Sequence, residues 1–222
     1  MENINFDLYL IRHGESEANR KKNIICGRSP NAPLTRKGRL QAKSLGQRLA
    51  GEGIKFDKVF SSPFVRALDT CDLAVEPTGF RPDRVIIDDA LVEMSQGEWE
   101  GRIREQVYIK DVLIDMNSQG KFFLPEGGES QRLIERRASN WFEDNILYNS
   151  EFYDGVHRTF AVFTHTQWVR AFLHYVMGFN DRLIHKIAID NASLTRLYFD
   201  KSGWGIGPQF NDTSHLKIEE PK

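Results

Sequence analysis

The stretch LYLIRHGESEAN, residues 8–19, decides how this chain is interpreted. Residues 8–11 are apolar and have the character of a short buried strand, and Arg12, His13 and Gly14 follow at once. A cation and an imidazole at a strand tip either close a surface strand or belong to a functional site. The choice depends on what the other strands of the sheet place at the same edge.

The composition is that of an ordinary globular protein. The chain has 222 residues, of which 40% are hydrophobic and 27% charged, and this length can bury a core without disulfides or metal ions. A formal net charge of -1 argues against nucleic acid as a partner. Cys26 and Cys71 form neither a metal-ligand spacing nor a disulfide framework, which favours a reducing compartment.

The sequence offers no membrane segment. No apolar run approaches the roughly 18 residues that a membrane-spanning helix needs. Met1 is followed directly by the first strand, without the basic and apolar segments of a signal peptide. We therefore expect a cytoplasmic protein without a membrane partner.

Strand and helix patterns alternate along the chain. Strands are expected at residues 7–11, 58–62, 84–88, 159–165 and 193–199. Helices are expected to follow Thr35 and Ser62 and to occupy residues 101–117, 129–147 and 167–177. This alternation predicts an α/β fold, a three-layer α/β/α sandwich with a mainly parallel central sheet.

Helix ends can be placed from capping residues. Thr35 is a candidate N-cap, and Gly51 or Gly53 is expected to end that helix. Ser62 is expected to cap the next helix, with Pro63 at its first position.

The stretch of about 94–158 contains two helical patterns and little strand signal. We expect a single domain, 1–222, in which this stretch is a helical insertion over the carboxyl edge of the strands. Within it, Ile103, Val107 and Ile114 are expected to share one helix face. The tail after Gly203 is polar, and its end is expected to be poorly ordered.

Three strands place unusual polar residues at one edge. Ligands of open α/β sheets bind beyond the carboxyl ends of the strands. Besides Arg12 and His13, the strand at 58–62 ends in two serines with Arg66 in the next helix, and the strand at 159–165 ends in His165. Taken singly, each histidine is more often structural. Together, two arginines and two histidines beside helix N-termini predict a pocket for a phosphoryl group.

Seven stretches then occur in a specific order. The chain resembles the histidine phosphatase superfamily, which has the phosphoglycerate mutase-like fold, over residues 6–199. The resemblance rests on LIRHGESEAN (10–19), GRSPNAPLTRKGRLQA (27–42), VFSSPFVRALDTC (59–71), LVEMSQGEWEG (91–101), PEGGES (125–130), VFTHTQWVRAF (162–172) and NASLTRL (191–197).

The resemblance implies a phosphohistidine mechanism. His13 would be the nucleophile that attacks phosphorus, and water would then hydrolyse the phosphohistidine. Arg12, Arg66 and His165 would hold the phosphoryl oxygens and offset their charge in the transition state. No metal ion and no cofactor are implied, because cationic side chains supply the positive charge.

Further substrate contacts are expected around this centre. Asn19 and the backbone N–H of Thr166 are the expected additional donors. Arg28 is expected to bind substrate near the mouth of the phosphoryl pocket. The family commonly has glycine after its second histidine, whereas this chain has Thr166, Gln167 and the bulky Trp168. We expect these side chains to narrow the pocket or to add a hydroxyl donor.

Glu93 matches the acid of the family. It would protonate the leaving alkoxide and then act as base for water, with its pKa raised by the neighbouring phosphate. Glu98 and Glu100 are the competing choices and are expected to be structural or solvated. The remaining histidines have no motif around them and are expected on the surface or in the core; they are His157, His174, His185 and His215.

The resemblance leaves several reactions open. GEWEG and the separation of 72 positions from Glu93 to His165 favour a metal-independent phosphomonoester hydrolase. Phosphoglycerate mutase-type transfer is the alternative, with a second anion held by basic residues near the mouth: Arg20, Lys21, Lys22 and Arg28. A protein phosphatase or a regulatory phosphate-binding module also uses this fold. The expected partner is thus a phosphorylated small molecule or a phosphoprotein, and a homodimer stays open.

Overall fold

The computed structural model describes residues 4–216 and contains one six-stranded sheet. The strands are β1 (Asn5–Arg12), β2 (Lys58–Ser61), β3 (Ile86–Ile87), β4 (His157–Thr164), β5 (Leu194–Asp200) and β6 (Gly203–Ile206), in the order β3-β2-β4-β1-β5-β6. The pairs β1–β4, β2–β4 and β2–β3 are parallel, and β5 is antiparallel to β1 and β6. The predicted mainly parallel sheet is confirmed.

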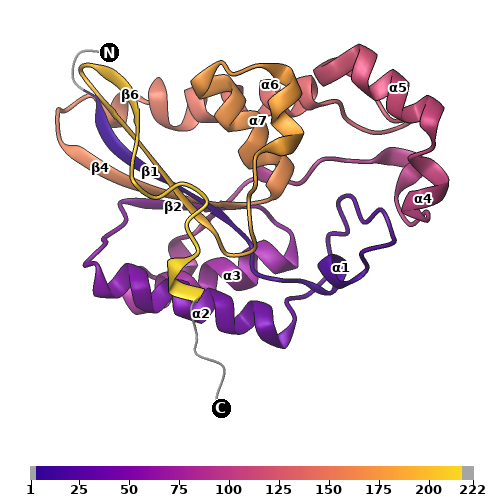
Figure 1. The fold of residues 1–222 in the computed structure, drawn as a ribbon. Coiled ribbons are helices and arrows are strands. Elements are labelled where there is room, and N and C mark those ends of the chain that lie inside the picture. Colours follow the sequence, from indigo (N-terminus) through magenta and orange to yellow (C-terminus); the bar gives the residue numbers. More distant parts are fainter. Residues whose placement is uncertain (1–3, 217–222) are drawn as a thin grey trace.

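Helices cover both faces of this sheet (Figure 1). The pair α2 (Arg36–Gly51) and α3 (Val65–Val75) covers one face, and α6 (Gln131–Phe142) and α7 (Thr166–Met177) cover the other. The short α1 (Glu17–Arg20), α4 (Arg104–Val107) and α5 (Lys110–Gln119) lie toward one end of the sheet. This confirms the three-layer α/β/α architecture.

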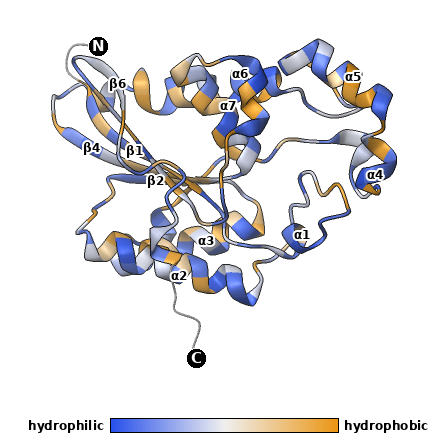
Figure 2. Ribbon diagram, viewed as in Figure 1, coloured by the Kyte–Doolittle hydropathy of each residue, from blue (hydrophilic) through white to orange (hydrophobic). Residues whose placement is uncertain are grey.

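Two hydrophobic cores follow from the alternation of side chains along the strands. Phe6, Leu8 and Leu10 of β1 face the α6–α7 layer, whereas Tyr9 and Ile11 face the α2–α3 layer. Because β1 is buried on both faces, its central residues 8–11 are all apolar. In Figure 2, α2 alternates between hydrophilic and hydrophobic residues, as expected for a helix with one buried face.

Most predicted elements exist with boundaries shifted by a few residues. Thr35 caps α2 through its side chain, and α2 ends at Gly51 as expected. Gly178, with φ of 61°, ends α7. The strand β6 was not expected. It pairs with β5 within the tail that follows the fifth predicted strand, and the end of that tail, 217–222, lies outside the described residues.

Three local predictions are wrong. Ser62 is not an N-cap, because α3 begins at Val65 and the Ser62 hydroxyl lies 2.8 Å from Nε2 of His165. The expected helix over 101–117 is divided into α4 and α5. Its apolar stripe does not form, since Val107 is buried while Ile103 and Ile114 are 40% and 53% exposed.

The loop after β1 depends on a close approach to α2. A Cβ on Gly38 would lie 1.9 Å from the carbonyl oxygen of Glu15, and a Cβ on Gly14 would lie 2.5 Å from the carbonyl oxygen of Gly38. Only glycine at both positions permits this contact. The segment that follows His13 is therefore held directly against the first turn of α2.

We predict that Gly38→Ala destabilises the protein by about 1–3 kcal/mol, because the added methyl group overpacks this contact. Gly51→Ala is the matched control in the same helix, since nothing lies within 4 Å of its added Cβ. It is expected to be neutral or to stabilise by up to about 1 kcal/mol. Urea unfolding midpoints measure both, and equal effects of the two substitutions would contradict the proposed contact.

Candidate active site

The register of the sheet brings the predicted residues together. Arg12 at the end of β1 is paired with Thr164 at the end of β4, and Ser61 of β2 is paired with Phe163. The residues that follow these strand ends therefore lie side by side at the carboxyl edge. The rings of His13 and His165 are 5.1 Å apart between centroids.

Two hydrogen bonds determine the tautomer of His13. Nδ1 lies 2.7 Å from the carbonyl oxygen of Gly14, and Nε2 lies 3.1 Å from Nε of Arg66. The guanidinium can only donate, so Nε2 must accept and Nδ1 must carry the proton. The lone pair of Nε2 is therefore directed toward the side where Arg66 lies.

The same surroundings keep His13 neutral. The ring is 2% exposed. Burial lowers the pKa of His13 well below its usual 6.5, and the positive charges of Arg66 and Arg12 lower the pKa further. A neutral imidazole whose Nε2 carries no proton is the form that can act as a nucleophile.

The two arginines are held by backbone carbonyl groups. Arg66 is 3% exposed and donates through one terminal nitrogen to the carbonyl oxygen of Ser29 at 2.8 Å. Arg12 donates to the carbonyl oxygen of Ile189 at 2.7 Å, and burial lowers the pKa of Arg12 to about 10. Within the described residues neither guanidinium forms a direct ion pair, although the Glu93 carboxyl raises the pKa of both arginines from a longer distance against the larger lowering effect of burial.

Buried donors without partners surround His13. Within residues 4–216, Nε of Arg12 and Nδ1 of His165 have no hydrogen-bond partner. Nε2 of His165 is occupied by the hydroxyl of Ser62 at 2.8 Å. Unpaired buried polar groups are rare because they cost desolvation free energy. An anion at this place would satisfy both nitrogens.

Glu93 lies at the N-terminus of α7. Its Oε1 accepts from the backbone N–H of Gln167 at 3.1 Å and from its neighbour Met94 at 2.9 Å. Burial raises the pKa of Glu93 above its usual 4.5, although these hydrogen bonds and the two arginines act in the opposite direction. The raised pKa therefore exists before any phosphate binds, from desolvation, whereas we expected the phosphate charge to cause it.

Glu98 and Glu100 have other surroundings. Glu98 is exposed, and Oε1 of Glu100 accepts from the backbone N–H groups of Gln96 and Arg28. This carboxylate ties together two loops. Among the described residues, neither carboxylate forms a hydrogen bond or an ion pair with His13 or His165.

Asn19 and Thr166 stand near this centre, whereas Arg28 is committed elsewhere. Oδ1 of Asn19 accepts from Ser16 and from Asn191, which leaves the amide nitrogen for a ligand. Thr166 is the first residue of α7. The guanidinium of Arg28 lies 3.3 Å from Oε2 of Glu129. The roles of these residues in binding stay predictions.

Of the three residues after His165 that were expected to narrow the pocket, Trp168 does not reach the site. The side chain of Trp168 is fully buried, and its Nε1 donates to the carbonyl oxygen of Ala90 at 2.8 Å. Because α7 turns by about 100° per residue, the third residue after His165 faces the core. Gln167 instead faces the cavities beside Glu93.

Sequence reasoning missed several supporting residues. Oγ1 of Thr70 accepts from the backbone N–H of Gly14 at 3.0 Å and donates to the carbonyl oxygen of Arg66 at 2.7 Å. Nδ2 of Asn191 donates to the carbonyl oxygen of His13 at 3.1 Å. Asn191 begins the NASLTRL motif, and Thr70 lies one helical turn after Arg66 in VFSSPFVRALDTC. Both residues therefore belong to motifs that carry the family resemblance.

The geometry predicts how His13 titrates in the free protein. NMR of the labelled ring should show Nε2 without a proton and a pKa below 6.5. Arg66→Gln removes a positive charge and the donor to Nε2, so the pKa of His13 is expected to rise. Arg39→Gln, at an exposed guanidinium paired with Asp69, is the control and should leave the pKa of His13 unchanged. An ordinary His13 pKa in the unaltered protein would contradict this description.

The chain is similar to enzymes that act on phosphorylated small molecules. A 2,3-bisphosphoglycerate-dependent phosphoglycerate mutase from Azorhizobium caulinodans is 35% identical over 142 residues, covering 63% of this chain and 68% of the relative. The fructose-2,6-bisphosphatase TIGAR from Xenopus tropicalis is 32% identical over 139 residues, covering 62% of this chain and 49% of the relative.

Solved structures of phosphatases and mutases have the same fold as this chain. A phosphoserine phosphatase from Entamoeba histolytica, solved with 3-phosphoglyceric acid, has a TM-score of 0.78 at 25% identity and covers 95% of this chain and 99% of that chain. A phosphoglycerate mutase from Bacillus anthracis has the same fold, with a TM-score of 0.75 at 19% identity over 97% of this chain and 96% of that chain. The profile of the histidine phosphatase superfamily (branch 1) matches residues 8–212. The chain belongs to the histidine phosphatase superfamily.

Proposed function

We propose that this protein hydrolyses phosphomonoesters of small molecules through a phosphohistidine on His13. The observation that carries the proposal is the hydrogen bond from Nε of Arg66 to Nε2 of His13 at 3.1 Å. It places an unprotonated nitrogen and a fixed cation at the same point. A phosphoryl group there meets its nucleophile and its countercharge together.

The first half-reaction forms the phosphoenzyme. Nε2 of His13 attacks phosphorus, the bond from phosphorus to the ester oxygen breaks, and Glu93 gives its proton to the departing alkoxide. Arg12, Arg66 and Nδ1 of His165 hold the three equatorial oxygens, whose charge grows in the transition state. The carbonyl oxygen of Gly14 accepts from Nδ1 and stabilises the positive charge that develops on the ring.

The second half-reaction restores the enzyme. Water attacks phosphorus, the bond from phosphorus to Nε2 breaks, and the Glu93 carboxylate takes the proton of the water. Inorganic phosphate leaves, and His13 and Glu93 return to their starting protonation states.

Within the described residues no helix is long and apolar enough to cross a membrane. A cytoplasmic location remains part of this proposal.

Phosphoglycerate mutase activity is the second candidate, favoured by the relative from Azorhizobium caulinodans. A mutase must hold a second anionic group. Of the four basic residues considered for this, Arg20 and Arg28 lie against Glu17 and Glu129. Lys21 and Lys22 line a cavity of about 260 Å³ that also includes Glu93. Lys21 and Lys22 are thus the two basic residues that remain to hold a second anionic group of the substrate.

Trapping the phosphoenzyme tests the proposal. Incubation with a 32P-labelled alkyl phosphate followed by a rapid alkaline-detergent quench should give an acid-labile label on His13. The label and phosphate release should both be lost in His13→Ala. His157→Ala is the control, since this half-exposed histidine contacts Asn5 and Asp7 at the far end of the sheet.

The same experiment separates the two candidate functions. When the labelled phosphoenzyme is mixed with unlabelled 3-phosphoglycerate, a hydrolase passes the label to water as inorganic phosphate, whereas a mutase passes it to the phosphoglycerate as labelled bisphosphoglycerate. Turnover in His13→Ala at the rate of the unaltered protein would rule out both phosphohistidine mechanisms.

The role of Glu93 is tested by varying the leaving group. We predict that Glu93→Gln lowers kcat for an alkyl phosphate by about 10²–10⁴-fold, because the poor leaving group needs a proton. The loss should be much smaller for 4-nitrophenyl phosphate, whose leaving group departs as a stable anion. Glu98→Gln serves as the control, with no effect expected on either ester. A loss of equal size for both esters would show that Glu93 is not the general acid.

A further inference from the structure

A second cavity adjoins the phosphoryl site. It has a volume of about 520 Å³ and lies between α4–α5, the start of α6 and the segment Asp181–Lys186. It shares Met94, Gln96, Tyr108 and Gln167 with the cavity that contains Glu93. Glu93 is the group that would protonate the leaving alkoxide. The larger cavity therefore begins where the alcohol part of a substrate must lie.

Aromatic and aliphatic side chains form much of its wall. The ring of Trp99 lies 5.7 Å from the rings of both Tyr108 and Phe123, measured between centroids. Leu113 of α5 also lines the cavity although it is 44% exposed. Such walls favour an apolar body of aromatic size. The volume lies in the range of about 300–1,000 Å³ that encloses drug-sized ligands, which a three-carbon acid would leave mostly empty.

One buried acceptor in this wall has no partner. Gln131 is 3% exposed, and its Nε2 donates to Oε1 of Gln167 at 2.8 Å and lies 3.7 Å from the sulfur of Met94. Oε1 of Gln131 has no hydrogen-bond partner among the described residues. An amide oxygen carries no hydrogen and can only accept a hydrogen bond. A ligand with a hydroxyl or N–H donor would satisfy it.

We propose that this cavity is the leaving-group site, and that the substrate is the phosphomonoester of an alcohol with an aromatic-sized apolar body and a hydrogen-bond donor near the ester. Oε1 of Gln131 accepts from that donor, and Trp99, Phe123 and Leu113 enclose the apolar body. The proposal rests on the proposed function, since it assumes that phosphoryl transfer occurs at His13. It assigns substrate selection to the helical segment α4–α5 and to the Gln131–Gln167 pair.

Esters of matched alcohols test the apolar wall. Propyl phosphate and 3-phenylpropyl phosphate have leaving groups of similar basicity, so the ratio of their kcat/KM values reports binding of the phenyl group. We expect a preference of about tenfold or more for the phenyl ester. Leu113→Trp, which fills the cavity, and Trp99→Ala, which removes its wall, should each bring the ratio toward one.

The neighbouring residue of α5 provides the matched control. Ile114 is 53% exposed and does not line the cavity, so Ile114→Ala should keep the ratio of the unaltered protein. Propyl phosphate hydrolysed as efficiently as 3-phenylpropyl phosphate, with a label on His13, would overturn the leaving-group site and leave the proposed function standing.

The donor is tested by a second pair of esters. The ratio of kcat/KM for 2-hydroxy-3-phenylpropyl phosphate to that for 3-phenylpropyl phosphate should fall about three- to tenfold in Gln131→Met, which keeps the size of the side chain but not its acceptor. Comparing the ratio within each variant cancels any general loss from breaking the bond to Gln167. An unchanged ratio would show that Gln131 does not accept a hydrogen bond from the hydroxyl group of the substrate.

A binding measurement keeps the inference separate from catalysis. The phosphonate analogues butylphosphonate and 4-phenylbutylphosphonate carry CH2 in place of the ester oxygen and cannot be cleaved. Calorimetry should show tighter binding of the phenyl compound, with the difference lost in Leu113→Trp. If the protein cleaves no ester, the proposed function fails, and equal affinity for the two phosphonates would then also overturn the cavity assignment.

Discussion

The hydrogen bond between Arg66 and His13 is the interaction on which the rest of the site depends. A guanidinium group has no lone pair to accept with, so its approach to Nε2 excludes a proton there and forces the proton onto Nδ1. Burial lowers the pKa of His13, and the positive charge that this bond brings next to the ring lowers the pKa further, so the ring stays neutral. One contact between β1 and α3 thus sets the tautomer, the charge and the orientation of the reacting group.

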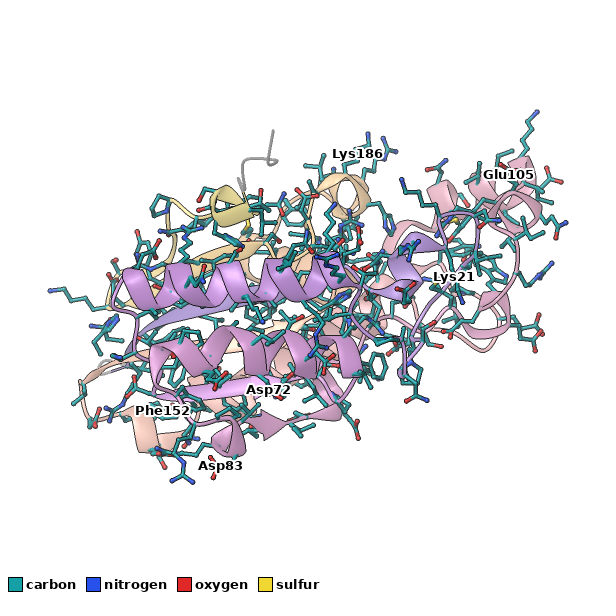
Figure 3. The ribbon with its side chains drawn as sticks, turned by 90° about the horizontal axis from the view of Figure 1, so that it is seen from below. Lys21, Asp72, Asp83, Glu105, Phe152 and Lys186 are labelled. Carbon is teal, nitrogen blue, oxygen red and sulfur yellow. The ribbon has the colours of Figure 1, made fainter. Side chains whose placement is uncertain are left out.

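The fold maintains this contact from several directions. The parallel register of β1, β2 and β4 brings three strand ends to the same edge. The close packing of Gly14 and Glu15 against Gly38 holds the loop after His13 in place. Figure 3 shows α2 and α3 side by side along the sheet, with Lys21 and Glu105 toward the end where α1 and α4 lie and Phe152 toward the opposite end. The candidate site therefore occupies one end of an otherwise closed sandwich.

The two cavities divide the chemistry between different parts of the molecule. Under the proposed function, the phosphoryl group would meet residues that the sheet and the first turns of α3 and α7 hold in place. The alcohol would instead meet α4–α5, where α5 has no buried residue and packs loosely. A phosphoryl centre held by the sheet, combined with a separate wall for the rest of the substrate, is consistent with relatives that include both mutases and phosphatases.

The sequence by itself determined the fold class, the approximate positions of the main strands along the chain and the edge where the charged residues meet. It could do so because strand burial, helix caps such as Thr35 and the motif order are local properties of the chain. Only the tertiary structure decided the tautomer of His13, the use of Ser62 as a partner of His165 instead of a helix cap, and the burial of Trp168. The tertiary structure also divides the expected helix over 101–117 into α4 and α5. Ile103 and Ile114 remain exposed there because they do not pack against the core. These outcomes depend on contacts between residues far apart in the chain, as with Arg66 and His13, and no local pattern specifies such contacts.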